Sequence, residues 1–329
     1  MQAIVCTRYG SPDVLQLREM QKPSPKANEI LVKVYAASVT AADGMMREGS
    51  PYFGRLFIGL LKPKSPIPGA GFAGKVAAVG AEVTRFKKGD PVFGESIAGF
   101  GAYAEFLCVP EDGIIATTPR SITFEQAAAL CDGALTSINF LKNVAKIQRG
   151  QSVLINGASG SLGTAAVQLA GHFGAKVTGV CGAAHIEMVK SLGADEVIDY
   201  SKKDFTKTGR TYDIIYDTVG KSSFSRCKDS LSEKGVYVSP VLGLPLLLQM
   251  LWTSRIGNKK ARFSATGLLP VAELLILLIE LVALVEAEKI NSVMDKSYPL
   301  ELTAEAHRYV DKGHKKGNVV ITMHPDSKT

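Results

Sequence analysis

A short stretch with three glycines carries the clearest chemical signal in the sequence, SVLINGASGSLGTAAVQLA at residues 152–170. Apolar residues precede the glycines and an alanine-rich segment follows them, which predicts a strand, a tight turn and a helix. Gly160 and Gly163 fit the second and third glycines of a dinucleotide-binding fingerprint, with Ala158 at the first position. A bare structural turn is the alternative interpretation. Because the start of such a helix binds a pyrophosphate, we expect a dinucleotide to contact Ala158, Ser159, Gly160, Ser161, Leu162 and Gly163.

The end of the next predicted strand indicates which dinucleotide binds. NAD-binding sites usually place Asp or Glu there, about 20 residues after the glycines, to bond the ribose 2′-hydroxyl. The residue 19 positions after Gly163 is Gly182, which has no carboxylate to repel a 2′-phosphate. His185, Lys190 and Tyr200 follow and can donate hydrogen bonds to a phosphate. NADPH is therefore the predicted cofactor, and an ordinary surface role for His185 or Tyr200 is the alternative.

Two kinds of patterning position these residues. Up to about residue 120, short apolar or alternating segments such as EILVKVYAASV (29–39) are separated by turn-rich stretches, which predicts a mostly antiparallel β-barrel. From about Thr123 onward, helical and strand segments alternate, which predicts a parallel sheet covered on both faces. The predicted fold class is α/β, with residues 1–122 and 293–329 as a catalytic domain and residues 123–292 as a doubly wound nucleotide-binding domain. The final strand NVVIT (318–322) is expected to rejoin the first domain.

Composition excludes several classes of function. The net charge is +7, but the basic residues are scattered and no stacking aromatics interleave with them, so we expect no nucleic-acid partner. Five cysteines without a CxxC pair argue against a disulfide framework and against structural zinc. No secretory signal is visible, so a cytoplasmic location is expected, with an organelle stroma as the alternative. Glu273 and Glu280 interrupt the most apolar stretch, which favours a buried or interface helix over a membrane span.

Taken together, these segments resemble the medium-chain dehydrogenase/reductase superfamily, and specifically its zinc-independent quinone oxidoreductase branch. The resemblance covers nearly the whole chain and implies a GroES-like barrel beside a Rossmann domain. Zinc-dependent members carry Gly-His-Glu where this chain has Gly69, Ala70 and Gly71, and their four-cysteine lobe is absent here, so no metal is expected. His172, His307 and His314 are interpreted as helix-surface residues. The motifs that carry the resemblance, besides the glycine stretch, are PGAGFAGKVAAVG (68–80), FKKGDPVFG (86–94), AAALCDGALTSINFL (127–141), SLGADEVIDY (191–200) and AHRYVDKGHKKGNVVIT (306–322).

The resemblance also implies site residues. In ASVTAADGMMREG (37–49), Asp43 and Arg47 match the family, whereas Thr40 stands where Asn is usual and Met45 where some relatives have Tyr. Tyr52 is a candidate replacement for the missing polar donor, with a structural tyrosine as the alternative. The predicted catalytic residues are thus Thr40, Asp43, Arg47 and Tyr52. Thr136 matches a threonine beside the nicotinamide, the turn after Asp217 lies at a strand's carboxyl end, and the remaining predicted cofactor contacts are Val219 and Asn318.

Hydride donation to an electron-poor acceptor needs no protein nucleophile, because the cofactor supplies the reaction and the protein supplies position and one polarising donor. The sequence therefore predicts an NADPH-dependent reductase of a quinone, an enone or an alkenal. A zinc-free alcohol or enoyl-thioester reductase, and a non-catalytic NADPH-binding scaffold or membrane-associated protein, stay open as alternatives. A homodimer is expected, with no transmembrane segment and with peripheral membrane contact left open. The apolar segment VLGLPLLLQMLW (241–252) is interpreted either as the lining of a pocket or as a subunit contact.

Overall fold

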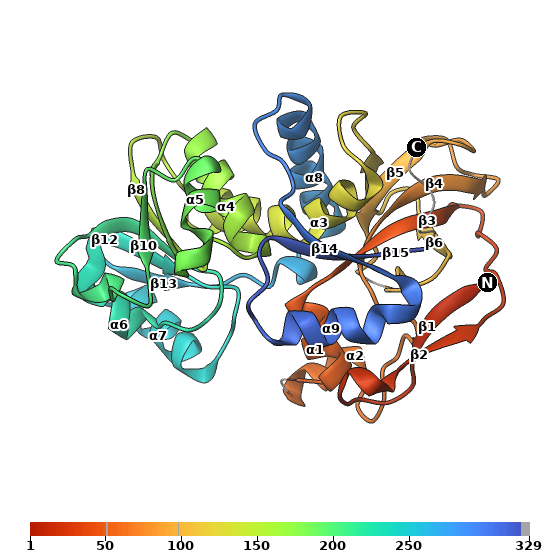
Figure 1. Cartoon of the computed structure of the whole chain (residues 1–329), viewed down its shortest axis with the longest axis horizontal. Helices are drawn as coiled ribbons and strands as arrows, with labels where there is room; N and C mark the ends of the chain where they lie inside the picture. Colours follow the sequence, from red (N-terminus) through yellow and green to blue (C-terminus); the bar gives the residue numbers. More distant parts are fainter. Residues whose placement is uncertain (51, 98, 324–329) are drawn as a thin grey trace. The chain divides into compact units, whose positions relative to one another are not determined.

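The computed structural model describes residues 1–50, 52–97 and 99–323, and its chain forms two compact units (Figure 1). Helix α3 (Phe124–Ile138) contains the boundary between them along the chain. Unit 1 consists of Met1–Asp132, Pro270–Glu286 and Ser292–Thr329, and unit 2 consists of Gly133–Leu269 and Ala287–Asn291.

Unit 1 is built on a seven-stranded, mostly antiparallel sheet in the order β14-β15-β3-β4-β5-β7, with β6 also paired to β3. The Val- and Ile-rich β3 is its longest strand, and β15, the last strand of the described residues, pairs with it. Buried side chains such as Ile30, Phe72 and Ile321 form the core. The strands are β1 (Gln2–Cys6), β2 (Leu15–Glu19), β3 (Glu29–Val39), β4 (Gly71–Val79), β5 (Pro91–Glu95), β6 (Phe106–Pro110), β7 (Ile114–Thr117), β14 (Met294–Pro299) and β15 (Asn318–Thr322).

The helices of unit 1 include α8, which is the most apolar segment of the sequence. Its leucines at 274, 277, 278 and 281 are buried at helical spacing, and the helix packs against β7. One face of α8 is thus buried, and none of the described helices has the length and apolarity that crossing a membrane requires. The predicted domain limits, which place residues 123–292 together, stay a prediction. The helices are α1 (Ala41–Glu48), α2 (Arg55–Ile58), α8 (Val271–Glu286) and α9 (Thr303–Asp311).

Unit 2 is a six-stranded parallel sheet in the order β10-β9-β8-β11-β12-β13. In order of appearance this is 3-2-1-4-5-6, the doubly wound order, so the crossovers reverse direction between β8 and β11. Ligands of such sheets bind beyond the carboxyl ends of the strands at this switch point. The predicted α/β fold class is confirmed. The elements are β8 (Ser152–Asn156), α4 (Ser161–His172), β9 (Lys176–Cys181), α5 (Ile186–Ser191), β10 (Glu196–Asp199), β11 (Tyr212–Asp217), α6 (Phe224–Cys227), β12 (Leu231–Val238), α7 (Leu244–Arg255) and β13 (Lys260–Arg262).

Candidate functional site

The glycine loop lies between β8 and α4, at the switch point of the sheet in unit 2. Gly157 has a φ of +82°, and a Cβ there would lie 2.6 Å from Thr218 Oγ1. A Cβ on Gly163 would lie 2.0 Å from the carbonyl oxygen of Gly157, so helix α4 rests directly on the loop backbone. The fold itself therefore requires glycine at both positions.

Gly160 differs from these two glycines. A Cβ added there would meet only the carbonyl oxygen of Gly157, at an ordinary 3.6 Å. Gly160 is also the N-cap of α4, so no side chain caps the helix from that position, and the first turn contains no acidic residue. The positive end of α4 therefore suits an anionic group, and the space beside Gly160 leaves room for such a group near the backbone.

Helix α3 contributes to the same loop. Ser137 Oγ donates a hydrogen bond to the carbonyl oxygen of Leu162 at 2.9 Å. A Cβ on Gly133 would lie 2.5 Å from Ser161 Oγ, so the two helices approach closely. The predicted cofactor residue Thr136 is half-buried on this helix. Sequence reasoning missed Gly133 and Ser137, although both lie in the quoted segment around Thr136.

Four residues near the end of β9 were predicted to select NADPH, and two of them, Gly182 and Tyr200, lie together. A Cβ on Gly182 would lie 3.3 Å from the hydroxyl oxygen of Tyr200, and the backbone N–H of Tyr200 donates to the carbonyl oxygen of Cys181 at 3.2 Å. Tyr200 is 62% exposed and lies beside a backbone position without a side chain. His185 is half-buried just after β9. Lys190 lies on α5 and forms an exposed ion pair with Glu187 at 3.2 Å.

Asp217 ends β11 and has a structural role that the sequence did not reveal. Its fully buried carboxylate accepts hydrogen bonds from Asn156 Nδ2 at 2.9 Å, from the backbone N–H of Ser222 at 2.8 Å and from the Tyr237 hydroxyl at 2.9 Å. Burial, together with this carboxylate, raises the pKa of Tyr237. These bonds fix the turn that presents Val219, whose side chain is exposed.

In unit 1, Thr40 and Asp43 bind each other. Thr40 is the N-cap of α1, and its hydroxyl accepts the backbone N–H of Asp43 at 3.0 Å and donates to Asp43 Oδ2 at 2.7 Å. The backbone N–H of Thr40 donates to the same carboxylate at 2.9 Å. Both residues are buried in this capping box. The observed contacts of Thr40 and Asp43 therefore cap the N-terminus of α1.

Arg47 connects three parts of unit 1. Its Nη1 lies 3.0 Å from Nδ1 of His307, Nη2 lies 3.0 Å from Asp311 Oδ2, and Nε donates to the carbonyl oxygen of Gly10 at 3.1 Å. The interpretation of His307 as a helix-surface residue is wrong, because its side chain is 1% exposed. Burial and the Arg47 guanidinium lower the pKa of His307 to about 3, so the imidazole is neutral and accepts from Arg47 through Nδ1.

The last two predicted residues are a surface tyrosine and a buried asparagine. Tyr52 is 80% exposed, and the guanidinium of Arg55 lies 4.6 Å from its ring centre. Asn318 begins β15, is buried, and donates from Nδ2 to the carbonyl oxygen of Val293 at 3.1 Å.

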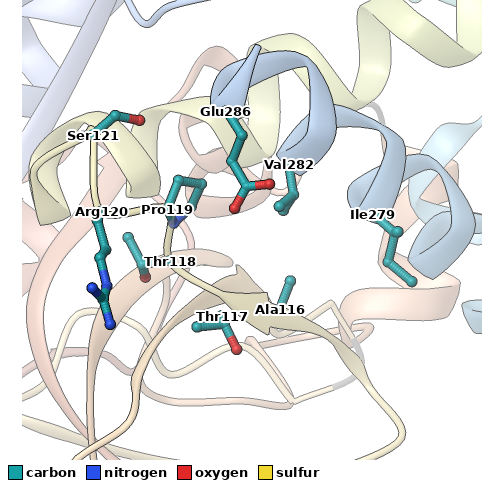
Figure 2. A pocket seen from close by; sticks show the side chains of 9 residues that line it. All are labelled: Ala116, Thr117, Thr118, Pro119, Arg120, Ser121, Ile279, Val282 and Glu286. Carbon is teal, nitrogen blue, oxygen red and sulfur yellow. The ribbon is translucent and has the colours of Figure 1, made fainter. Parts of the chain in front are cut away.

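A cavity of ≈ 470 Å³ in unit 1 lies apart from all of these residues (Figure 2). It is lined by the segment after β7, including Thr118 and Arg120, and by Ile279, Val282 and Glu286 of α8. The Thr118 hydroxyl is buried there without a hydrogen-bond partner. None of the residues predicted for catalysis or cofactor binding lines this cavity.

Two family models match the chain. One described as "Alcohol dehydrogenase GroES-like domain" covers residues 26–119, and one described as "Zinc-binding dehydrogenase" covers residues 192–321. A chloroplastic quinone-oxidoreductase homolog of Spinacia oleracea is 34% identical over 98% of this chain and 98% of that protein. This chain belongs to the medium-chain dehydrogenase/reductase superfamily, in its quinone oxidoreductase-like branch.

Other members of the superfamily are similar over the whole chain. An NADPH-dependent alkenal/one oxidoreductase from Arabidopsis thaliana is 31% identical over 98% of this chain and 79% of that protein. The structure of Escherichia coli quinone oxidoreductase complexed with NADPH aligns with a TM-score of 0.84 at 28% identity, over 98% of this chain and 100% of that one. The chain is thus a member of a family of NAD(P)H-dependent oxidoreductases.

The description of the second family model names zinc, and the residues of this chain do not fit that metal. A Cβ on Gly71, where zinc-dependent relatives carry Glu, would lie 2.4 Å from Ser38 Oγ, and Ala70 has no donor atom. Within the described parts of the chain, no group of three or more His, Cys, Asp or Glu side chains is placed to hold a metal ion.

Proposed function

We propose that this protein is a zinc-independent reductase that uses NADPH to reduce a quinone or an α,β-unsaturated carbonyl compound. The observation that carries the proposal is the space at Gly160, where an added Cβ meets nothing closer than 3.6 Å although the neighbouring loop glycines are packed against protein atoms. That space adjoins the uncapped start of α4, as a bound pyrophosphate requires.

The preference for the phosphorylated cofactor rests on Gly182 and Tyr200. No side chain at position 182 repels a 2′-phosphate, and the hydroxyl of the exposed Tyr200 lies at that position and can donate to it. Lys190 can join them at little cost, because its exposed pair with Glu187 contributes little to stability. We keep Thr136, His185, Val219 and Asn318 as proposed cofactor contacts.

When bound, NADPH supplies the hydride, and the chain's residues bind and orient it. The proposed catalytic residues Thr40, Asp43 and Arg47 are occupied by one another or by other residues of unit 1. They therefore act as positioning residues that hold α1 in place. Because these side chains already bind other protein groups, the start of α1 suits an acceptor that is electron-poor, such as a quinone or an enone, better than one that must be strongly polarised. Tyr52 stays a proposed donor.

The internal contacts of Thr40, Asp43 and Arg47 also favour the second hypothesis, a scaffold that binds NADPH without turnover. The two hypotheses are separated by following NADPH absorbance with a naphthoquinone, an alkenal and a crotonyl thioester. We expect oxidation of NADPH with the quinone or the alkenal, unchanged by a metal chelator. Binding of NADPH without turnover of any of the three favours the scaffold, and turnover of the thioester alone favours an enoyl-thioester reductase.

We also propose a homodimer in the cytoplasm. The five cysteines are free, and burial raises the pKa of Cys108, Cys181 and Cys227 to about 11, so these thiols are poorly reactive. Unpaired thiols suit a reducing compartment. Analytical ultracentrifugation tests the dimer, and a single species with the mass of one chain would contradict it.

A further inference from the structure

Helix α7 is apolar on two opposite faces. Leu246 and Thr253 are buried on one face, where the helix packs beside β13 and against the core that includes Phe224 of α6 (Figure 1). The other face is exposed to solvent in the described structure, and its residues recur at the spacing of one helical stripe. These exposed residues are Leu244, Leu247, Leu248, Leu251 and Trp252. An apolar stripe of this size on a surface marks a place where something docks.

The chain segment that contains this stripe is strongly basic. Residues 221–262 contain eight Lys or Arg and two Asp or Glu, a net charge of +6 out of +7 for the whole chain. No acidic residue occurs between Glu233 and Glu273. Arg255 ends α7 in line with the exposed stripe and has no partner within the described chain, and Lys260 Nζ donates to the carbonyl oxygen of Gly257 just beyond the helix at 3.0 Å. The apolar face therefore ends in a cluster of positive charge.

We propose that the exposed face of α7 docks on the surface of an anionic lipid bilayer. An apolar stripe beside basic residues binds such a surface through two attractions at once, burial of the stripe among the acyl chains and attraction of the basic residues to anionic headgroups. A helix of 12 residues is about 18 Å long, shorter than the roughly 30 Å hydrocarbon layer, so α7 lies in the plane of the interface.

A second copy of the chain fits this face less well. A two-fold contact sets the same patch against itself, so the positive charges around Arg255 would face each other, and the chain between Glu233 and Glu273 has no acidic residue to pair them. The exposed apolar face of α8, with Ile276 and Ile279, carries Glu273 and Glu280 on the same helix, which contains no Lys or Arg. It serves as a matched control surface. The inference does not depend on the proposed catalytic activity.

Trp252 makes the test direct, because it is the chain's one tryptophan and is 65% exposed. Its emission is measured while the full-length protein is titrated with vesicles of phosphatidylcholine, with or without phosphatidylglycerol. We expect a blue shift with the anionic vesicles, none with the neutral ones, and reversal by high salt. Unchanged emission with anionic vesicles would overturn the proposal. An emission already blue-shifted without lipid, which moves to the red on dilution, would show that a second copy covers the face and would overturn it too.

Variants locate the docking surface. L248S with L251S is expected to reduce co-flotation with anionic vesicles about tenfold or more, and Arg255→Glu to reduce it less. I276S with I279S on α8 is the control and should float as the parent does. Far-UV circular dichroism establishes that each variant is folded. Loss of flotation in the α8 variant, or parental flotation in the α7 variant, would contradict the assignment to α7.

Discussion

The glycine loop of unit 2 and the start of α1 in unit 1 were both predicted to be functional, and their polar groups are used in opposite ways. Around Gly160 the fold leaves space beside the backbone, and the N-cap residue of α4 provides no side-chain cap. Thr40 and Asp43 bind each other, and Arg47 binds His307 and Asp311 of the same unit. The start of α4 therefore has room for a ligand, whereas the polar side chains of the α1 motif hold the fold of unit 1 together.

The largest expected effect is on stability, from Arg47→Ala. The substitution leaves the buried Nδ1 of His307 without its partner and Asp311 without its ion pair. Removing one partner of a buried charged cluster costs about 3 to 5 kcal/mol. Urea unfolding measures the loss, and the NADPH affinity of the folded protein is expected to stay unchanged.

Arg308→Ala is the control for Arg47, because Arg308 lies on α9 and pairs with Asp13 in an exposed position. We expect a change of less than about 1 kcal/mol there. If Arg47→Ala instead keeps parental stability and loses turnover, the guanidinium acts on substrate and the comparison between the two regions fails.

The next largest effect is on cofactor binding, from Gly160→Val. A Cβ at position 160 makes only one ordinary contact, at 3.6 Å from the carbonyl oxygen of Gly157, so we expect stability to change little while NADPH affinity falls about a hundredfold, or about 2.7 kcal/mol. Gly171→Val on the same helix is the matched control, since a Cβ there meets nothing within 4 Å. Parental NADPH binding by Gly160→Val, measured by calorimetry, would disprove the loop assignment.

Tyr200→Phe tests whether the Tyr200 hydroxyl contacts the 2′-phosphate of NADPH. Loss of the hydroxyl that lies beside Gly182 removes one hydrogen bond to the 2′-phosphate, so NADPH affinity is expected to fall about tenfold. NADH, which lacks that phosphate, should bind variant and parent alike. Equal losses for both cofactors would mean that Tyr200 does not contact the phosphate.

His307 predicts a pH dependence for unit 1. Its pKa is lowered to about 3 in the folded chain from 6.5, so the unfolded chain binds the proton first as the pH falls. Stability from the neutral imidazole is complete above pH 6.5 and is lost below it, at up to about 1.4 kcal/mol per pH unit. Urea unfolding between pH 7 and pH 5 measures it against His307→Gln, which can still accept from Arg47. Parallel curves for the two proteins would contradict the buried, neutral state.

Thr40→Ala has the smallest expected effect. It removes the N-cap of α1, which costs about 1 kcal/mol, and Thr40→Ser should restore the loss because it keeps the hydroxyl. The kcat of the Ala variant, measured at a temperature where it is folded, is expected to stay near the parental value. A large fall in kcat with full stability would return Thr40 to a catalytic role.

The sequence predicted the parts that depend on local spacing. The positions of Gly160 and Gly163 and the alternation of strands and helices were enough to predict the loop and the fold class. The burial of His307 was also within reach, because Thr303, His307 and Val310 fall on one helical stripe and all three are buried. The interpretation of His307 as a helix-surface residue did not use this spacing and was wrong.

Other features depend on partners that are distant along the chain. Arg47 and His307 are 260 residues apart, and Tyr237 meets Asp217 across two strands, so no local pattern indicates that these polar groups satisfy one another. A buried arginine is expected only when its partners are known. The contacts of the α1 side chains with distant residues could therefore be found only in the three-dimensional structure.

The central claim is that the chain binds a phosphorylated dinucleotide at the start of α4. Calorimetric titration of the purified protein with NADPH and, separately, with NADH tests it most directly. We predict one NADPH per chain, bound about tenfold or more tightly than NADH, because only NADPH offers a phosphate to Tyr200. Tighter binding of NADH, or no binding of NADPH, would contradict the account.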